Sequence, residues 1–190
     1  MLQLKIIVAS TRPGRKGIVI AKWILETAQK QSEFETELLD LAEINLPFLD
    51  EPEHPRFKKY SKQHTFEWSA KIESGDAFIA VTPEYNYGYP APLKNALDFV
   101  YQEWGNKPIA FVSYGGIAGG IRAVQLLKPV VLAMKMIPIL EAVNIPMFTQ
   151  YIHEGRFIAN DIIQKSADHM LRELVRWGGS LKELRMKGSI

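Results

Sequence analysis

Five short apolar runs alternate with amphipathic segments along this chain, and that alternation constrains the fold more than any other feature. Residues 4–10, 77–83 and 108–114 are continuously apolar, as is typical of strands buried on both faces of a sheet. Residues 34–41 are partly alternating and residues 136–146 carry two prolines, so these two runs are expected at sheet edges. The pattern therefore predicts five strands, three of them central.

The segments between the runs place apolar residues at spacings of three and four, as helices that cover a sheet do. They span residues 17–31, 58–74, 91–104, 120–135 and a last helix from about residue 160, which Gly178-Gly179 should end. Strands that alternate with helices form parallel sheets. We predict one α/β domain over residues 1–190, a flavodoxin-like doubly wound five-stranded parallel sheet of order 2-1-3-4-5 with helices on both faces.

Composition narrows the possible chemistry. The 190 residues include no cysteine, which excludes disulfides, iron–sulfur clusters and cysteine nucleophiles, and the four histidines have no metal-ligand spacing. The formal net charge is only +2, so nothing favours nucleic acid as a partner. No apolar run approaches the ~20 residues that span a bilayer, and the N-terminus lacks signal-peptide features. We expect a soluble cytoplasmic protein that binds no metal, nucleic acid or membrane.

In a sheet of this order, ligands bind outside the carboxyl ends of the strands where the winding reverses. That position singles out the loops at residues 10–17, 83–90 and 113–120, called here the first, second and third loops.

The first loop offers hydroxyl groups, cations and flexible backbone just before a helix. A helix N-terminus presents unpaired amide groups with partial positive charge, and this combination suits a phosphate dianion. The alternative is a basic surface turn with a Ser/Thr cap. The candidate phosphate-binding side chains are Ser10, Arg12, Arg15 and Lys16.

The second loop reads PEYNYGYP, and its rigid rings and special backbone residues are more than a simple turn needs. Prolines fix φ, Gly88 permits positive φ, and tyrosines supply stiff flat surface. Asn86 is expected to cap the next helix or bind a ligand. Such a loop can hold backbone groups around the edge of a planar ring. The alternative is aromatic packing with a helix cap.

The third loop, SYGGIAGGIRA, contains two glycine pairs through which backbone can approach something flat. Ser113 or Tyr114 can add a hydrogen bond, and the alternative is a turn that only serves tight helix–sheet packing. One phosphate loop and two ring loops on one rim describe a mononucleotide with a large flat head. Flavin mononucleotide (FMN) fits that description best.

The stretches ASTRPGRKG, VTPEYNYGYPAPLKNALDF and VSYGGIAGG, in this order, resemble the NADPH-dependent FMN reductase family over nearly the whole chain. PEYN is the most specific of these signals. The resemblance implies bound FMN and hydride transfer from NADPH or NADH through FMN to a small acceptor, which is a flavin, a quinone, an azo compound or a metal oxyanion. It also implies a homodimer or homotetramer, in line with aromatic residues gathered around the third helix: Tyr87, Tyr89, Tyr101 and Trp104.

The resemblance also assigns residues to the cofactor, and it assigns no catalytic side chain because FMN carries the chemistry. It implies that the phosphate is held by Ser10, Arg12, Gly17 and Ile18. It places around the isoalloxazine ring Pro83, Glu84, Tyr85 and Asn86, with Ser113, Tyr114, Gly115 and Gly116 on the other edge.

Two other functions stay open at the level of sequence. A flavodoxin-like electron carrier or redox-sensing protein would bind flavin with little NAD(P)H turnover. A nucleoside-cleaving enzyme would use Glu84 as a carboxylate nucleophile, although no second placed carboxylate is evident.

Overall fold

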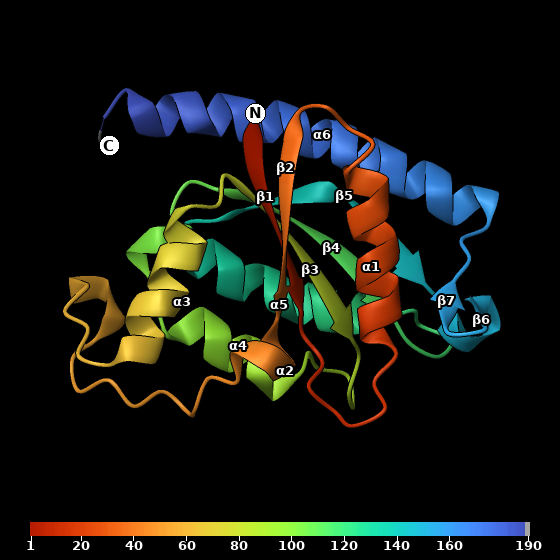
Figure 1. The fold of residues 1–190 in the computed structure, drawn as a ribbon, viewed down its shortest axis with the longest axis horizontal. Coiled ribbons are helices and arrows are strands. Elements are labelled where there is room, and N and C mark those ends of the chain that lie inside the picture. The colour runs from red at the N-terminus through yellow and green to blue at the C-terminus, as the bar shows by residue number, and fades with distance from the viewer. Residues whose placement is uncertain (189–190) are drawn as a thin grey trace.

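The computed structural model describes residues 1–188 and contains a five-stranded parallel sheet (Figure 1). The strands are β1 (Leu2–Val8), β2 (Phe34–Asp40), β3 (Ala77–Pro83), β4 (Pro108–Tyr114) and β5 (Ile137–Ile145). Their order is β2-β1-β3-β4-β5, which confirms the predicted topology and both predicted edge strands. Every residue of β3 and β4 is buried, whereas β5 includes exposed and partly buried positions, as expected of an edge strand.

The register of the sheet brings the three candidate loops to one edge. Val8 at the end of β1 pairs with Val81 in β3, and Pro83 at the end of β3 pairs with Tyr114 at the end of β4. In Figure 1 the arrowheads of these strands point to the lower edge of the molecule, where the loops after β1 and β3 lie.

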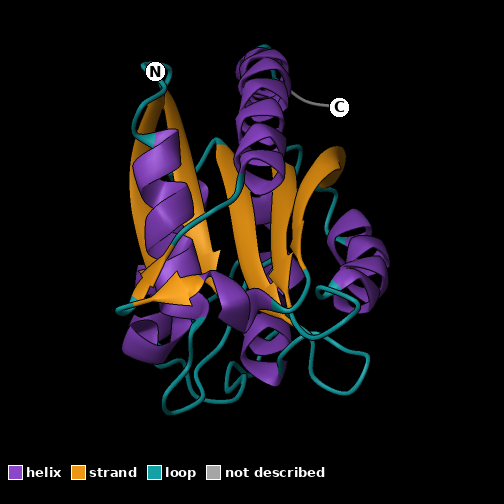
Figure 2. Cartoon of the chain, turned by 90° about the vertical axis from the view of Figure 1, so that its right-hand side faces the viewer, coloured by secondary structure: helices purple, strands orange, loops and turns teal. Residues whose placement is uncertain are grey.

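Helices cover both faces of the sheet, as predicted (Figure 2). One face is covered by α1 (Gly17–Ala28) and α6 (Asp161–Met186), and the other by α3 (Gln63–Glu73), α4 (Ala91–Asp98) and α5 (Ile121–Ala133). The sequence did not indicate the short elements: α2 (Leu41–Ile44), 3-10 turns at Pro55–Phe57, Gln102–Trp104 and Phe148–Tyr151, and a hairpin of β6 (Ile152–His153) and β7 (Arg156–Phe157).

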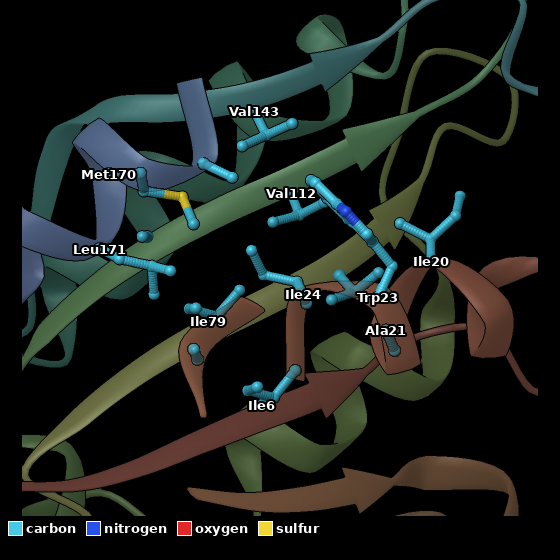
Figure 3. Packing of buried hydrophobic residues seen from close by; sticks show 14 of the residues in the cluster. Ile6, Ile20, Ala21, Trp23, Ile24, Ile79, Val112, Val143, Met170 and Leu171 are labelled. Carbon is cyan, nitrogen blue, oxygen red and sulfur yellow. The ribbon is translucent and has the colours of Figure 1, made fainter. Parts of the chain in front are cut away.

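Two hydrophobic cores hold the layers together. On the α1 and α6 side, Ile6, Ile79 and Val112 from the strands meet Ile24 from α1 and Met170 from α6 (Figure 3). The opposite core is more aromatic and contains Trp68, Phe78, Trp104 and Phe111. Each of these large apolar side chains contributes roughly 1.5–3 kcal/mol of transfer free energy when fully buried. The two cores therefore hold in place the strand ends that carry the three loops.

The last helix does not end at Gly178-Gly179, so that prediction was wrong. Gly178 is buried inside α6, and a Cβ atom there would lie 2.9 Å from Leu2 Cδ1. Its role is close packing of α6 on the sheet. The final turns are then held by Lys182 and Arg185, which pair with Asp76 at 2.7 and 2.8 Å. These contacts help to offset the ~1 kcal/mol that each glycine costs in a helix.

The third predicted helix is shorter than residues 91–104, because α4 ends at Asp98. Glu103 is buried, and its carboxylate accepts hydrogen bonds from the Tyr101 amide at 3.2 Å and from Ser69 Oγ at 2.6 Å. The Trp104 indole donates to the Leu97 carbonyl at 3.1 Å. These long-range contacts favour a 3-10 turn over a continued α-helix.

Candidate functional site

The first and second loops are joined directly. Ser10 Oγ and Tyr85 Oη lie 2.7 Å apart, with Ser10 buried and Tyr85 partly exposed. The third loop reaches the same place through Tyr114, because a Cβ atom at Gly17 would overlap the Tyr114 hydroxyl. Three segments far apart in the sequence thus form one continuous rim at the carboxyl ends of β1, β3 and β4.

The first loop leaves a helix N-terminus open to an anion. Lys16 is the N-cap of α1 but provides no side-chain cap, and the first turn contains no acidic residue. The first amide groups of a helix have no partner within it, so they remain available to a ligand. Arg12 and Lys16 are exposed, and neither forms an ion pair within residues 1–188. This donor set suits a phosphate group.

Arg15 is ion-paired within the protein, so its predicted role as a phosphate ligand stays a prediction. Its guanidinium is held by Asp40, with the shortest contact at 2.7 Å, and it also donates to the Ser10 carbonyl at 3.3 Å. Asp40 in turn caps α2 by accepting from the Ala42 amide at 3.0 Å. The sequence could not show that a cation in the loop would be neutralised by a carboxylate at the end of β2. Arg15 fixes the base of the loop.

The second loop is a tight hairpin turn. Tyr85 and Gly88 exchange both backbone hydrogen bonds at 2.8 and 2.9 Å, and the two residues between them have φ of 48° for Asn86 and 72° for Tyr87. Positive φ at both central positions defines a type I′ turn. The expectation that Gly88 supplies the positive φ was therefore wrong. Asn86 does not cap the next helix either, because Pro90 is the N-cap of α4.

Glu84 carries a buried carboxylate at this turn. One of its oxygens binds Arg122 of α5, and the Arg122 guanidinium lies 3.9 Å from the centre of the Tyr87 ring. The hydrogen bond that Arg122 donates to Glu84 raises the pKa of Arg122. The second carboxylate oxygen, Oε2, is buried and has no partner within the described chain. An ion-paired Glu84 is poorly suited to act as a nucleophile, which weakens the nucleoside-cleaving alternative.

Arg122 was missed by the sequence reasoning, although it stands two residues after the second glycine pair of the third loop. Its contacts join the second loop to the start of α5, so it belongs to the same rim.

Ser113 and Tyr114 are buried and their side chains contact other parts of the protein, so their predicted place at a ring edge stays a prediction. Ser113 Oγ lies 2.8 Å from the Gly119 carbonyl and 2.9 Å from Asn144 Oδ1. Tyr114 is 4% exposed and packs edge-on against Phe148, and burial raises the pKa of its hydroxyl, aided by Tyr85. These two side chains support the loops from below.

The two glycine pairs of the third loop have different roles. Gly119 and Gly120 adopt φ of 58° and 84°, and Cβ atoms there would come within 2.9 Å of Pro146 N and 2.8 Å of Ser113 Cβ. A Cβ atom at Gly116 would meet nothing within 4 Å. The second pair therefore serves packing, while Gly116 borders open space where a flat ligand can approach.

The residues present fit FMN. An uncapped helix N-terminus with exposed Arg12 suits the phosphate, and open backbone at Gly116 suits the ring. The buried, unpartnered Glu84 Oε2 is a polar group that still lacks a donor. Within residues 1–188, no group of three His, Asp or Glu is placed to hold a metal ion, and no helix there is long and apolar enough to cross a membrane.

Comparison with known proteins gives consistent matches. The family model described as NADPH-dependent FMN reductase matches residues 2–150. An NAD(P)H-dependent FMN reductase of Schizosaccharomyces pombe is 42% identical over 148 residues, which cover 76% of this chain and 74% of the relative. An NADPH azoreductase of Bacillus sp. strain OY1-2 is 32% identical over 126 residues, covering 64% and 65%. The solved structure of FerB, an NAD(P)H:acceptor oxidoreductase from Paracoccus denitrificans, has the same fold, with a TM-score of 0.76 at 22% identity over 95% and 98% of the two chains.

Proposed function

This chain belongs to the NADPH-dependent FMN reductase family, and on that premise we propose that it is an FMN-dependent NAD(P)H oxidoreductase. Such an enzyme would transfer hydride from NADPH or NADH to a small acceptor, and FMN would supply the redox chemistry when bound. The observation that carries the proposal is the rim itself, where the Ser10–Tyr85 contact joins a phosphate-binding loop to a ring-binding loop at the reversal of the sheet.

The first loop holds the phosphate. The amides of Gly17 and Ile18 lie in the first turn of α1, where backbone N–H groups have no helical partner. Arg12 and Lys16 add charge, and a charge-assisted hydrogen bond to phosphate contributes roughly 1.5–3 kcal/mol. Ser10 is shared with Tyr85, so it orders the loop and stays within reach of the ligand.

The second and third loops hold the ring. The turn at residues 83–86 and the backbone at Gly115 and Gly116 lie on neighbouring strand ends. When bound, FMN supplies the two-electron chemistry of hydride acceptance and delivery. The chain's own task is to orient donor and acceptor against it, which raises the rate by lowering the entropic cost of the encounter. No side chain is assigned as a general acid or base.

One experiment separates this function from its rival, an electron carrier or redox sensor. The purified protein is mixed with FMN, its visible flavin spectrum is recorded, and NADPH is added anaerobically. Rapid bleaching is the expected result. A bound flavin that NADPH does not bleach would support the carrier, and a protein that binds no FMN would exclude both.

We also propose a homodimer or homotetramer, formed through the face made by α4 and α5. Leu126 and Leu132 of α5 are 53% and 55% exposed although the opposite side of the helix is buried. A mostly apolar pocket of about 630 Å³ lies between the two helices, with Leu97 of α4 and Val130 of α5 in its lining. The predicted aromatic cluster supports this less than expected, because Trp104 is fully buried. Sedimentation at micromolar concentration tests the proposal, and an active monomer would contradict it.

The chain's organisation and location remain proposals as well. We propose that it acts as one FMN-binding domain, because a single sheet carries all three loops. The cytoplasm as its location stays a prediction from composition.

A further inference from the structure

We propose that a second pocket, beside the first loop, binds an uncharged planar ligand, and that this ligand is the electron acceptor. The identity of the ligand as acceptor rests on the proposed function, whereas the existence of the site does not. The pocket has a volume of about 470 Å³, within the range of small-molecule sites. Its lining includes Thr11, Asn45, Phe48, Ala91 and Pro92.

The pocket adjoins the proposed flavin site on two sides. Thr11 belongs to the first loop, and Ala91 and Pro92 follow the second loop directly. A ligand in the pocket therefore lies against the first loop and against the start of α4, directly after the second loop.

The outer wall of the pocket belongs to the connection between α2 and α3, residues 45–62, and several hydrogen bonds hold this connection in place. Asn95 of α4 donates to the Pro47 carbonyl at 2.7 Å and accepts from the Leu49 amide at 3.1 Å. Beyond them, the Glu51 carboxylate accepts from the Ser61 and Lys62 amides at 2.8 and 3.0 Å, next to the start of α3. Long connections in compact domains are usually either functional or disordered. The connection at residues 45–62 is ordered by side-chain hydrogen bonds, so we infer that it has a function as the wall of the pocket.

Phe48 sits on that wall as an exposed ring. Its side chain is 87% exposed, yet the residues on both sides of it are bound by Asn95. An isolated exposed apolar residue is ordinary and needs no explanation. Here the ring stands on fixed backbone at the edge of a pocket, so it offers a ready stacking surface to a planar ligand.

The chemistry of the lining selects the kind of ligand. No Asp, Glu, Lys, Arg or His lines the pocket. Its polar side chains are neutral, and the amide of Asn95 is already used by the wall. Thr11 and Asn45 bring a hydroxyl and an amide that can donate to a carbonyl oxygen. An uncharged planar molecule with carbonyl groups fits this lining, whereas a metal oxyanion would lack a cation to balance its charge.

The test is a titration of the full chain with 1,4-naphthoquinone, with and without FMN, followed by backbone amide resonances. We expect the resonances of Thr11 and Asn45 to shift. Replacing the exposed ring with Phe48→Ser should weaken quinone binding roughly 2- to 10-fold, the range of an aromatic pair. The matched control is Phe57→Ser, because Phe57 is 49% exposed on the same connection but does not line the pocket. It should leave the affinity unchanged. A filling variant, Ala91→Trp, should also weaken the quinone.

Steady-state kinetics add a second readout. Phe48→Ser should raise the KM for naphthoquinone and leave the KM for NADPH and the dissociation constant of FMN unchanged. Equal effects of Phe48→Ser and Phe57→Ser, or shifts of Thr11 and Asn45 caused by NADP⁺ and not by the quinone, would overturn the proposal. If NADPH reduces the bound flavin but the quinone does not bind at the pocket, the pocket proposal is wrong and the proposed function stands. If the quinone binds at the pocket but the protein binds no FMN, the proposed function and the acceptor role are wrong, whereas the binding site is confirmed.

Discussion

Ser10 Oγ and Tyr85 Oη lie 2.7 Å apart, so the loop after β1 is hydrogen-bonded to the loop after β3. Ser10 is buried and cannot move far, whereas Tyr85 is 39% exposed and stands on a two-residue turn. The contact therefore ties an exposed side chain to a buried one. It sets the distance between the phosphate loop and the ring loop before any ligand arrives.

Tyr85→Phe should weaken FMN binding roughly 2- to 10-fold, because it removes one hydrogen bond worth about 1 kcal/mol from the pre-formed rim. The melting temperature should change little, since the ring remains. Fluorescence titration of FMN measures the effect. Tyr89→Phe is the control, because no hydrogen bond to its hydroxyl is present within residues 1–188. Equal affinity of both variants would mean that the Ser10–Tyr85 contact does not organise the site.

Gly116→Val and Gly120→Val should separate binding from folding. Valine at Gly116 should abolish FMN binding with a normal thermal melt, because the new side chain enters the open space proposed for the ring. Valine at Gly120 should destabilise the fold by at least roughly 1–3 kcal/mol, since φ is 84° and Ser113 leaves no room. Titration with FMN measures the affinity of each variant, and a thermal melt measures its stability. A Gly116→Val protein that still binds FMN would show that the third loop does not border the ring.

Asp76→Asn should lower the unfolding free energy at pH 7 by roughly 1–3 kcal/mol, because Lys182 and Arg185 lose a charged partner. Burial alone would raise the pKa of Asp76, but the hydrogen bonds from Lys182 and the Gln3 amide outweigh it and lower the pKa below 3.8. The stabilisation is thus present above pH 3.8 and is lost as pH falls through the folded-state pKa. Urea unfolding across this range should show wild type and variant converging in acid, and a constant gap would contradict the assignment.

Lys107 predicts a second pH dependence, this time in base. Burial, with a contribution from Arg185, lowers its pKa from 10.5 to about 8, while its Nζ donates to the Ile72 and Glu73 carbonyls at 2.8 Å. Between pH 8 and 10.5 the unfolded chain holds a proton that the folded chain has lost. Stability from this group therefore rises with pH there, by at most about 1.4 kcal/mol per unit. Lys107→Met should remove that slope in urea unfolding, and an unchanged slope would contradict it.

The sequence predicted the architecture well because strand order depends on patterns that each segment carries by itself. Fully apolar runs gave the central strands, and the partly polar runs at residues 34–41 and 136–146 gave the edges. The predictions of helix ends were wrong where a contact with a residue distant in the sequence determines the local structure. Gly178 looked like a helix end, yet Leu2 explains why it is a glycine within α6.

The sequence predicted which three loops border the candidate site, but not the contacts that their side chains make. The three loops follow from the sheet order alone. Arg15 is paired with Asp40 at the end of β2, a contact that the loop's own sequence does not show. Ser113 and Tyr114 were expected on the rim, but their side chains are buried. The sequence could not show this, because the direction of a side chain at a strand end depends on the pleat and on packing. Arg122 acquires its role only through contact with Glu84 and Tyr87.

The most direct test of the account compares FMN with riboflavin, which lacks the phosphate, on the wild type, on Arg12→Ala and on the control Lys30→Ala. Lys30 is exposed at the far end of α1. If the first loop holds the phosphate, Arg12→Ala should weaken FMN roughly 10- to 100-fold, as expected for the loss of one charge-assisted hydrogen bond. Riboflavin should lose little, Lys30→Ala should change neither ligand, and the free energy of unfolding should move by less than about 0.5 kcal/mol. Equal weakening of both ligands, or of neither, would contradict the placement of FMN on this rim.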